Sequence, residues 1–94
     1  MEIKDNKFSR QFETNVVGGI LSVEYSFQDK KIFLSKIKQP EGYDDDEFLS
    51  DFLKEIMKII YQNKWKMVPI FPKIAIFVKR NPTYKDLLPP GIKL

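Results

Sequence analysis

The sequence predicts an α/β fold of the α+β type. A β-meander and one further, parallel strand form a mixed sheet, which carries a crossover helix and a short C-terminal helix. Three observations support this prediction: apolar and polar side chains alternate through the first 38 residues, a longer segment shows helical apolar spacing, and a strand-like segment follows it. With 94 residues, 43% of them hydrophobic, the chain suits a single domain, residues 1–94, with a modest core.

The first part of the chain predicts three strands. In residues 7–14, Phe8 and Phe12 fall on one face, and the glycines of the turn that follows permit positive φ. The segment 31–38 has apolar residues on both faces, which predicts an interior position in the sheet. Between them, residues 20–27 alternate, with these apolar side chains on one face: Leu21, Val23, Tyr25 and Phe27.

A long helix is predicted from about Asp45 to Gln62. Its apolar residues form one stripe at three- and four-residue spacing: Phe48, Leu49, Phe52, Leu53, Ile56, Ile59 and Ile60. Asp44 is the expected N-cap, and Glu47, three residues later, completes a capping box. Of the stripe, we expect these residues to be buried against the sheet: Phe52, Leu53, Ile56 and Ile60.

The C-terminal part continues the fold. Residues 63–70 predict a strand that lies parallel to 31–38 through a right-handed crossover. A short helix is expected over 72–80, because Pro72 is tolerated in a first turn and Asn81-Pro82 ends the helix. The remaining residues, 83–94, are predicted to be irregular.

The residue types that are missing exclude several kinds of chemistry. The chain has no Cys and no His, so it offers no disulfide, no zinc–thiolate site, no thiol nucleophile and no histidine base. Five carboxylates fall within residues 41–47, but the alternating ligands of an EF-hand loop are absent, so no metal is predicted. Without a long apolar segment or a signal-peptide core, we expect a soluble, cytoplasmic protein that binds no membrane.

Two short C-terminal segments, taken with the order of elements, resemble a small single-domain branch of the GNAT (N-acetyltransferase) superfamily. A Val-Pro-x-Cys-Pro segment of that branch is matched here by Val68, Pro69, Phe71 and Pro72. An Arg-His/Asn-Pro-x-Tyr segment is matched by Arg80, Asn81, Pro82 and Tyr84. The resemblance covers about residues 8–88 and implies a single GNAT-like domain that uses acetyl-CoA as acyl donor.

In GNAT proteins, acetyl-CoA lies between two splayed parallel strands, and a glycine-containing loop before the crossover helix binds its pyrophosphate through backbone N–H groups. The resemblance places the two strands at 31–38 and 63–70 and the loop just before the long helix. It implies these cofactor-binding positions: Ser35, Lys36, Ile37, Gly42, Tyr43, Asp44, Asp45, Asp46, Glu47, Phe71 and Asn81.

The cofactor loop departs from the family pattern. The two loop glycines fall on Asp45 and Glu47, and the flanking basic positions fall on Asp44 and Asp46. Gly42 lies three residues too early to replace them without a shift in register. Carboxylates at these positions repel phosphate charges. We therefore expect acetyl-CoA binding to be weak or absent.

The catalytic position departs as well. The branch's proposed catalytic cysteine corresponds to Phe71, whose ring is no nucleophile, and its His-Thr pair corresponds to Lys36-Ile37. No catalytic residue can be assigned from the family. Direct transfer to an acceptor amine stays open, and the side chains that could assist it are Glu24, Tyr25, Lys36 and Tyr84.

The sequence leaves two alternatives to an acetyltransferase. The first is a non-enzymatic interaction module that binds a basic protein partner with the strand cleft or the acidic helix start. The second is an anion- or nucleic-acid-binding role for the basic residues of 64–85, which we disfavour because the bases are scattered and the net charge is only +3. An active enzyme would take an amine substrate; the sequence sets neither its identity nor the oligomeric state.

Overall fold

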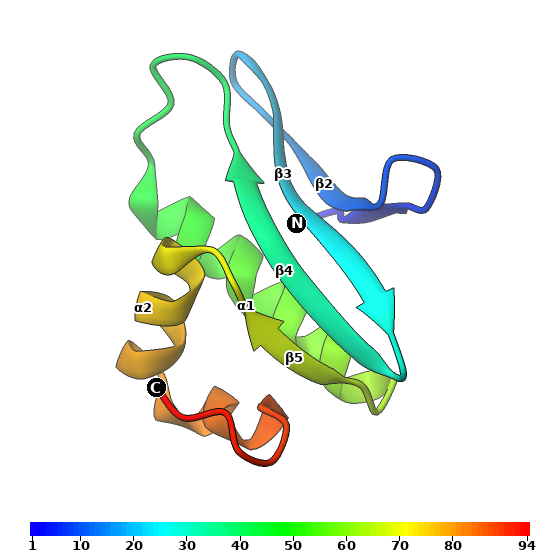
Figure 1. The fold of residues 1–94 in the computed structure, drawn as a ribbon. Helices are drawn as coiled ribbons and strands as arrows, with labels where there is room; N and C mark the ends of the chain where they lie inside the picture. The colour runs from blue at the N-terminus through cyan, green and yellow to red at the C-terminus, as the bar shows by residue number, and fades with distance from the viewer.

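A computed structural model of residues 1–94 shows a five-stranded mixed sheet with helices on one side (Figure 1). The elements in chain order are β1 (Lys4–Asn6), β2 (Gln11–Val16), β3 (Gly19–Gln28), β4 (Lys31–Lys38), α1 (Asp46–Gln62), β5 (Lys66–Pro69), α2 (Pro72–Arg80) and a 3₁₀ helix, η1 (Pro82–Leu87). The strand order is β1-β2-β3-β4-β5, antiparallel except for the last pair. The predicted α+β class with a mixed sheet is confirmed.

The crossover from β4 through α1 to β5 is confirmed. The two strands are parallel and pair from Lys31 opposite Lys66 to Leu34 opposite Pro69. The connection is right-handed: α1 passes behind the sheet and the chain returns beside β4 (Figure 1). The Leu34 carbonyl accepts the N–H groups of both Ile70 and Phe71, at 3.0 and 3.1 Å. Pairing ends there, so residues 35–38 of β4 have no partner in β5.

The prediction for the first strand is wrong at its start. Residues 7–10 form a turn, and the strand begins only at Gln11. The turn reverses the chain so that β1 can pair with β2, with Lys4 opposite Glu13. Phe8 therefore shares no face with Phe12: it is 99% exposed, whereas Phe12 is fully buried. We refer to residues 7–10 as the Phe8 turn.

A β-bulge interrupts the pairing of β3 with β4. Glu24 lies opposite Lys36 and Tyr25 opposite Leu34, so Ser35 has no residue opposite it. The Ser35 hydroxyl donates to the Glu24 carbonyl at 3.2 Å. Beyond the bulge, the apolar face of β3 is not buried to its end: Phe27 is 46% exposed and packs edge to face with Trp65, with ring centroids 4.9 Å apart.

The core lies between one face of the sheet and the helices. The four α1 residues that we expected to be buried are buried: Phe52, Leu53, Ile56 and Ile60. The same core includes side chains from the C-terminal elements, namely Ile74, Phe77, Val78 and Leu87. The prediction of an irregular tail is wrong for η1, whose Tyr84 ring stacks on Phe77 with centroids 5.6 Å apart. Packing against α2 thus orders a segment that has no strong pattern of its own.

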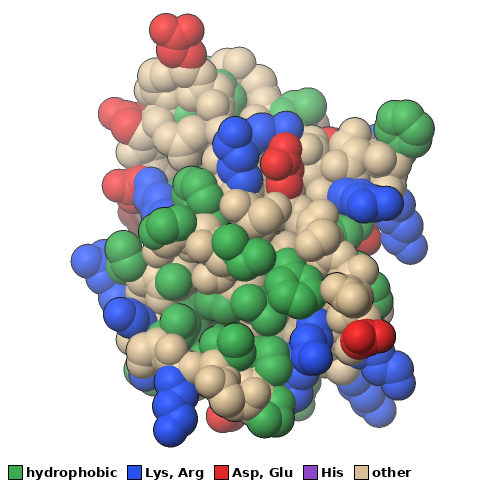
Figure 2. All heavy atoms as spheres, viewed as in Figure 1, with side chains coloured by type: hydrophobic (Ala, Val, Ile, Leu, Met, Phe, Trp, Pro, Cys, Tyr) green, Lys and Arg blue, Asp and Glu red, His purple; other side chains and the backbone are tan.

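The other face of the sheet has no helix over it. In β4, Ile32 and Leu34 are buried against the helices, whereas Phe33 is half-buried and Ser35 is exposed. The view in Figure 2, from the side opposite α1, shows hydrophobic side chains gathered over β4 and β5. None of the helices combines the length and the apolarity that crossing a bilayer requires.

Candidate functional site

The start of α1 is capped by Asp45. Its carboxylate Oδ1 accepts the backbone N–H of Phe48 at 3.0 Å, and its carbonyl accepts that of Leu49 at 3.1 Å. The prediction of Asp44 as N-cap with Glu47 in a capping box is therefore wrong by one residue. The Asp44 carbonyl instead accepts the N–H of Asp46 at 3.0 Å, which keeps the chain in a tight turn before the helix begins.

Replacing this cap should weaken the helix. We expect Asp45→Ala to lower the free energy of unfolding by about 1 kcal/mol, because the Phe48 N–H loses its acceptor. Urea unfolding measures the change. Asp44→Ala is the matched control, because it removes a neighbouring carboxylate that makes no hydrogen bond. It should lower the free energy of unfolding by less than Asp45→Ala does. If both variants lose the same free energy of unfolding, the negative charge and not the capping hydrogen bond stabilises the start of α1.

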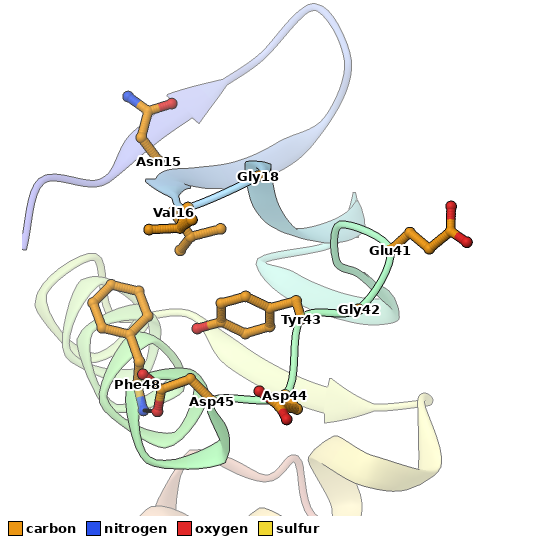
Figure 3. Close-up of a pocket in the computed structure, with 10 residues that line it drawn as sticks. Asn15, Val16, Gly18, Glu41, Gly42, Tyr43, Asp44, Asp45 and Phe48 are labelled. Atoms are coloured by element: carbon orange, nitrogen blue, oxygen red, sulfur yellow. Dashed lines mark hydrogen bonds between the residues drawn. The ribbon is translucent and has the colours of Figure 1, made fainter.

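The loop before α1 faces the β2–β3 turn across a hollow of about 810 Å³ (Figure 3). We refer to it as the Tyr43 hollow, and its lining residues are Asn15, Val16, Val17, Gly18, Glu41, Gly42, Tyr43, Asp44, Asp45 and Phe48. The turn lies beside Pro40, because a Cβ on Gly18 would be in ordinary van der Waals contact with the Pro40 Cβ, at 3.6 Å. Glycine is favoured there by its φ of +93°, which residues with a side chain rarely adopt.

The Tyr43 and Phe48 rings form the floor of this hollow, below Val16 (Figure 3). The Tyr43 hydroxyl is buried and has no hydrogen-bond partner. Removal from water raises the pKa of Tyr43, and the nearby carboxylates of Asp45, Asp44 and Asp46 raise this pKa further. The hydroxyl thus stays protonated at neutral pH. The hollow combines apolar and aromatic walls, one unused donor and several carboxylates.

A smaller hollow of about 210 Å³ lies between α1 and α2. It brings together two of the predicted cofactor-binding residues, Asp46 and Asn81, with Lys73 and Arg80. Lys73 Nζ lies 3.5 Å from Asp46 Oδ1 in an exposed ion pair. The Asn81 side chain is engaged at the end of α2, where it donates to the Phe77 carbonyl at 2.8 Å.

The predicted cofactor positions are therefore divided. Gly42, Tyr43, Asp44 and Asp45 line the Tyr43 hollow, and Asp46 and Asn81 line the smaller one. The remaining five line neither hollow: Ser35 and Lys36 are exposed on β4, Ile37 belongs to the core, Glu47 is exposed in the first turn of α1, and Phe71 is half-buried at the start of α2.

The four side chains considered for proton transfer are also placed outside both hollows. Glu24 pairs with Lys38 at 3.0 Å, and Lys36 is exposed. The Tyr25 hydroxyl donates to Asp5 at 2.5 Å; burial, and then this bond, raise the Tyr25 pKa, so the phenol keeps its proton. Tyr84 stacks on Phe77. Glu24 lies opposite Lys36 on the neighbouring strand, but no hydrogen bond or ion pair joins any two of the four side chains.

Sequence reasoning missed the part of the Tyr43 hollow that comes from the β2–β3 turn. Asn15, Val16 and Val17 belonged to a predicted turn, and the only signal in the sequence that could have found them is a pair of adjacent valines in that turn. No protein-family model matches this chain, and a comparison with the curated proteins gives no match either. No group of three or more Asp and Glu side chains is placed to hold a metal ion.

Proposed function

We propose that this chain is a GNAT-type N-acetyltransferase domain with a degenerate acetyl-CoA site, in which acetyl transfer is weak or lost. The observation that carries the proposal is the Asp45 carboxylate, which caps α1 at the place where such a domain binds the cofactor pyrophosphate. Two further features support it: the early end of the pairing between β4 and β5, and the nature of the residue at the catalytic position.

The early end of the pairing between β4 and β5 supports the GNAT-like part of the proposal. Beyond the Leu34–Pro69 pair, residues 35–38 of β4 have no partner in β5. The bulge at Ser35 lies at the same point, and bulges commonly occur where a sheet edge serves a binding or active site. The resemblance puts acetyl-CoA at this point between the two strands, although neither of the two hollows described above is lined by residues 35–38.

The charge at the helix start supports the loss of cofactor binding. An anion at a helix N-terminus uses the free N–H groups of the first turn, and here Asp45 already accepts that of Phe48. Asp44, Asp46 and Glu47 are exposed around it. At 4–5 Å, each carboxylate repels a phosphate charge by about 1 kcal/mol in water. A pyrophosphate would thus meet repulsion and would have to displace the cap.

The catalytic position supports the loss of covalent chemistry. Phe71 precedes α2 and packs partly against the core, and its backbone N–H is bound to the Leu34 carbonyl. A phenyl group neither attacks a thioester nor transfers a proton. Any residual activity would be direct attack by the acceptor amine on bound acetyl-CoA.

Titration of acetyl-CoA into ¹⁵N-labelled protein, followed by amide chemical shifts, tests the proposal. We expect no saturation below about 1 mM, because the pyrophosphate interaction that GNAT domains gain at the helix start is replaced by repulsion. Micromolar saturation, with shifts concentrated in residues 35–37 and 42–47, would contradict the degenerate site and would point to a loop in shifted register around Gly42. Coenzyme A without the acetyl group is the control for binding of the nucleotide part.

A second candidate function is a non-enzymatic interaction module. The observation that favours it is the Tyr43 hollow, whose apolar floor is bordered by the carboxylates of Glu41, Asp44 and Asp45. Such a surface suits a partner that presents an apolar group beside basic side chains.

A further inference from the structure

The Phe8 turn is the most exposed apolar feature of the chain. Phe8 is 99% exposed, and its neighbours Lys7, Ser9 and Arg10 are exposed as well. The turn is well defined, because the Asn6 side chain accepts the Ser9 N–H at 3.0 Å and β1 pairs with β2 on either side. An aromatic ring flanked by two basic side chains is thus held away from the body of the molecule.

The Tyr43 hollow has the complementary character. Its walls are the apolar and aromatic side chains of Val16, Tyr43 and Phe48, and Val17 beside them is 96% exposed. Its border carries the carboxylates of Glu41, Asp44 and Asp45, of which that of Glu41 extends outward, away from Tyr43 and Phe48 (Figure 3). With a volume of about 810 Å³ it has ample room for an aromatic side chain, and the buried Tyr43 hydroxyl has no partner within the chain.

We propose that the Tyr43 hollow receives the Phe8 turn of a second copy of this chain. Phe8 would lie against Tyr43 and Phe48, and Lys7 and Arg10 would face the carboxylates of the border. The turn projects from the β1–β2 side of the sheet, whereas the hollow lies at the loop between β4 and α1, so one chain cannot fill its own hollow (Figure 1). This inference goes beyond the proposed function, because it requires neither acetyl-CoA binding nor its loss.

The geometry sets the form of the assembly. Because the Phe8 turn and the Tyr43 hollow are different surfaces, the contact between two copies is head to tail. The resulting dimer has a free turn at one end and a free hollow at the other. The pairs therefore extend into longer oligomers as the concentration rises, unless the rotation happens to close a ring. A contact made by one four-residue turn is small, so we expect weak association. Its charged pairs lie at an exposed border, so salt should weaken it.

Analytical ultracentrifugation of the whole chain tests this, from about 10 µM to about 1 mM at low and high salt. We expect the average mass to rise with concentration and to fall again when salt is added. Phe8→Ser should abolish the rise, and its fold is safe because the ring contacts nothing in its own chain. Glu41→Lys/Asp44→Lys should abolish it too, and this variant leaves the helix cap Asp45 in place.

Mixing the two variants is the sharpest measurement. Phe8→Ser keeps an intact hollow and Glu41→Lys/Asp44→Lys keeps an intact turn, so together they should form a dimer that grows no further. Tyr61→Ser, which removes another exposed aromatic ring, on α1, is the control and should associate like the parent. Circular dichroism confirms that each variant is folded.

Three results would overturn the proposal. The parent could remain a monomer throughout the concentration range. Phe8→Ser could associate as the parent does, which would assign the contact to another surface such as the uncovered face of the sheet. The two variants that do not associate alone could fail to form a dimer when mixed, although both are folded. That result would show that the Phe8 turn does not bind the Tyr43 hollow. None of these results bears on acetyl-CoA, whose binding is measured separately.

Discussion

Phe52→Ala is expected to lower the free energy of unfolding by about 3–5 kcal/mol, as truncation of a buried aromatic residue generally does. Phe52 lies on the inner face of α1 and is fully buried within the common core of sheet and helices. Removal of its ring leaves a cavity that rigid strands on one side and α1 on the other can fill only in part. A domain of this size has about 5–15 kcal/mol of stability in total, so the loss is a large fraction.

Urea unfolding followed by far-UV circular dichroism measures this loss. Tyr61→Ala is the matched control, because Tyr61 is an aromatic residue of the same helix that is 73% exposed. It should change the stability by less than about 1 kcal/mol, as surface substitutions usually do. If Phe52→Ala unfolds at the same urea concentration as the parent, the core does not depend on this face of α1.

The second large effect is expected from giving the start of α1 the glycines and basic residues of a GNAT phosphate-binding loop. Asp45 and Glu47 are replaced by Gly, and Asp44 and Asp46 by Arg. This removes four negative charges, adds two positive ones and frees the Phe48 N–H that Asp45 now holds. Since each phosphate–carboxylate repulsion is about 1 kcal/mol in water, we expect acetyl-CoA to bind at least about 100-fold more tightly.

The same change should destabilise the helix by about 2–4 kcal/mol, through glycine entropy and the lost cap. The exposed ion pair of Lys73 with Asp46 is also lost, but such pairs contribute little. Calorimetry on parent and variant compares the affinities, and thermal unfolding confirms that the variant is folded. A control with arginines at Asp51 and Glu55, further along α1, shows whether added positive charge alone is sufficient. If the folded loop variant fails to bind, the region beyond the end of the β4–β5 pairing does not admit the cofactor, and the interaction module is the better description.

Local sequence patterns were sufficient to predict the packing of an element that buries a single face. The three- and four-residue spacing of α1 identified its buried face, because a helix can turn only one stripe toward a sheet. The parallel pairing of β4 with β5 also follows from the sequence, since a helix between two strands of one sheet returns the chain in the same direction. Both predictions depend on periodicity within a single segment.

Patterns failed where the chain reverses or where the register of a pair changes. Alternation placed Phe8 with Phe12, but it contains no signal that residues 7–10 leave the strand to let β1 pair with β2. The N-cap of α1 was misplaced by one residue, because three aspartates in succession are equivalent caps until the backbone selects Asp45. The bulge at Ser35 depends on the partner strand and has no local signature.

The sequence by itself determined the fold class, the helix faces and the acidic start of α1, because each depends on neighbours within one segment. Only the tertiary structure decided that Val16 and Gly18 lie across from Tyr43 and Phe48, since sheet pairing and the contact with Pro40 bring together residues far apart in the chain. The same is true of the division of the predicted cofactor residues between two hollows. A surface built from distant segments exists only after the chain has folded.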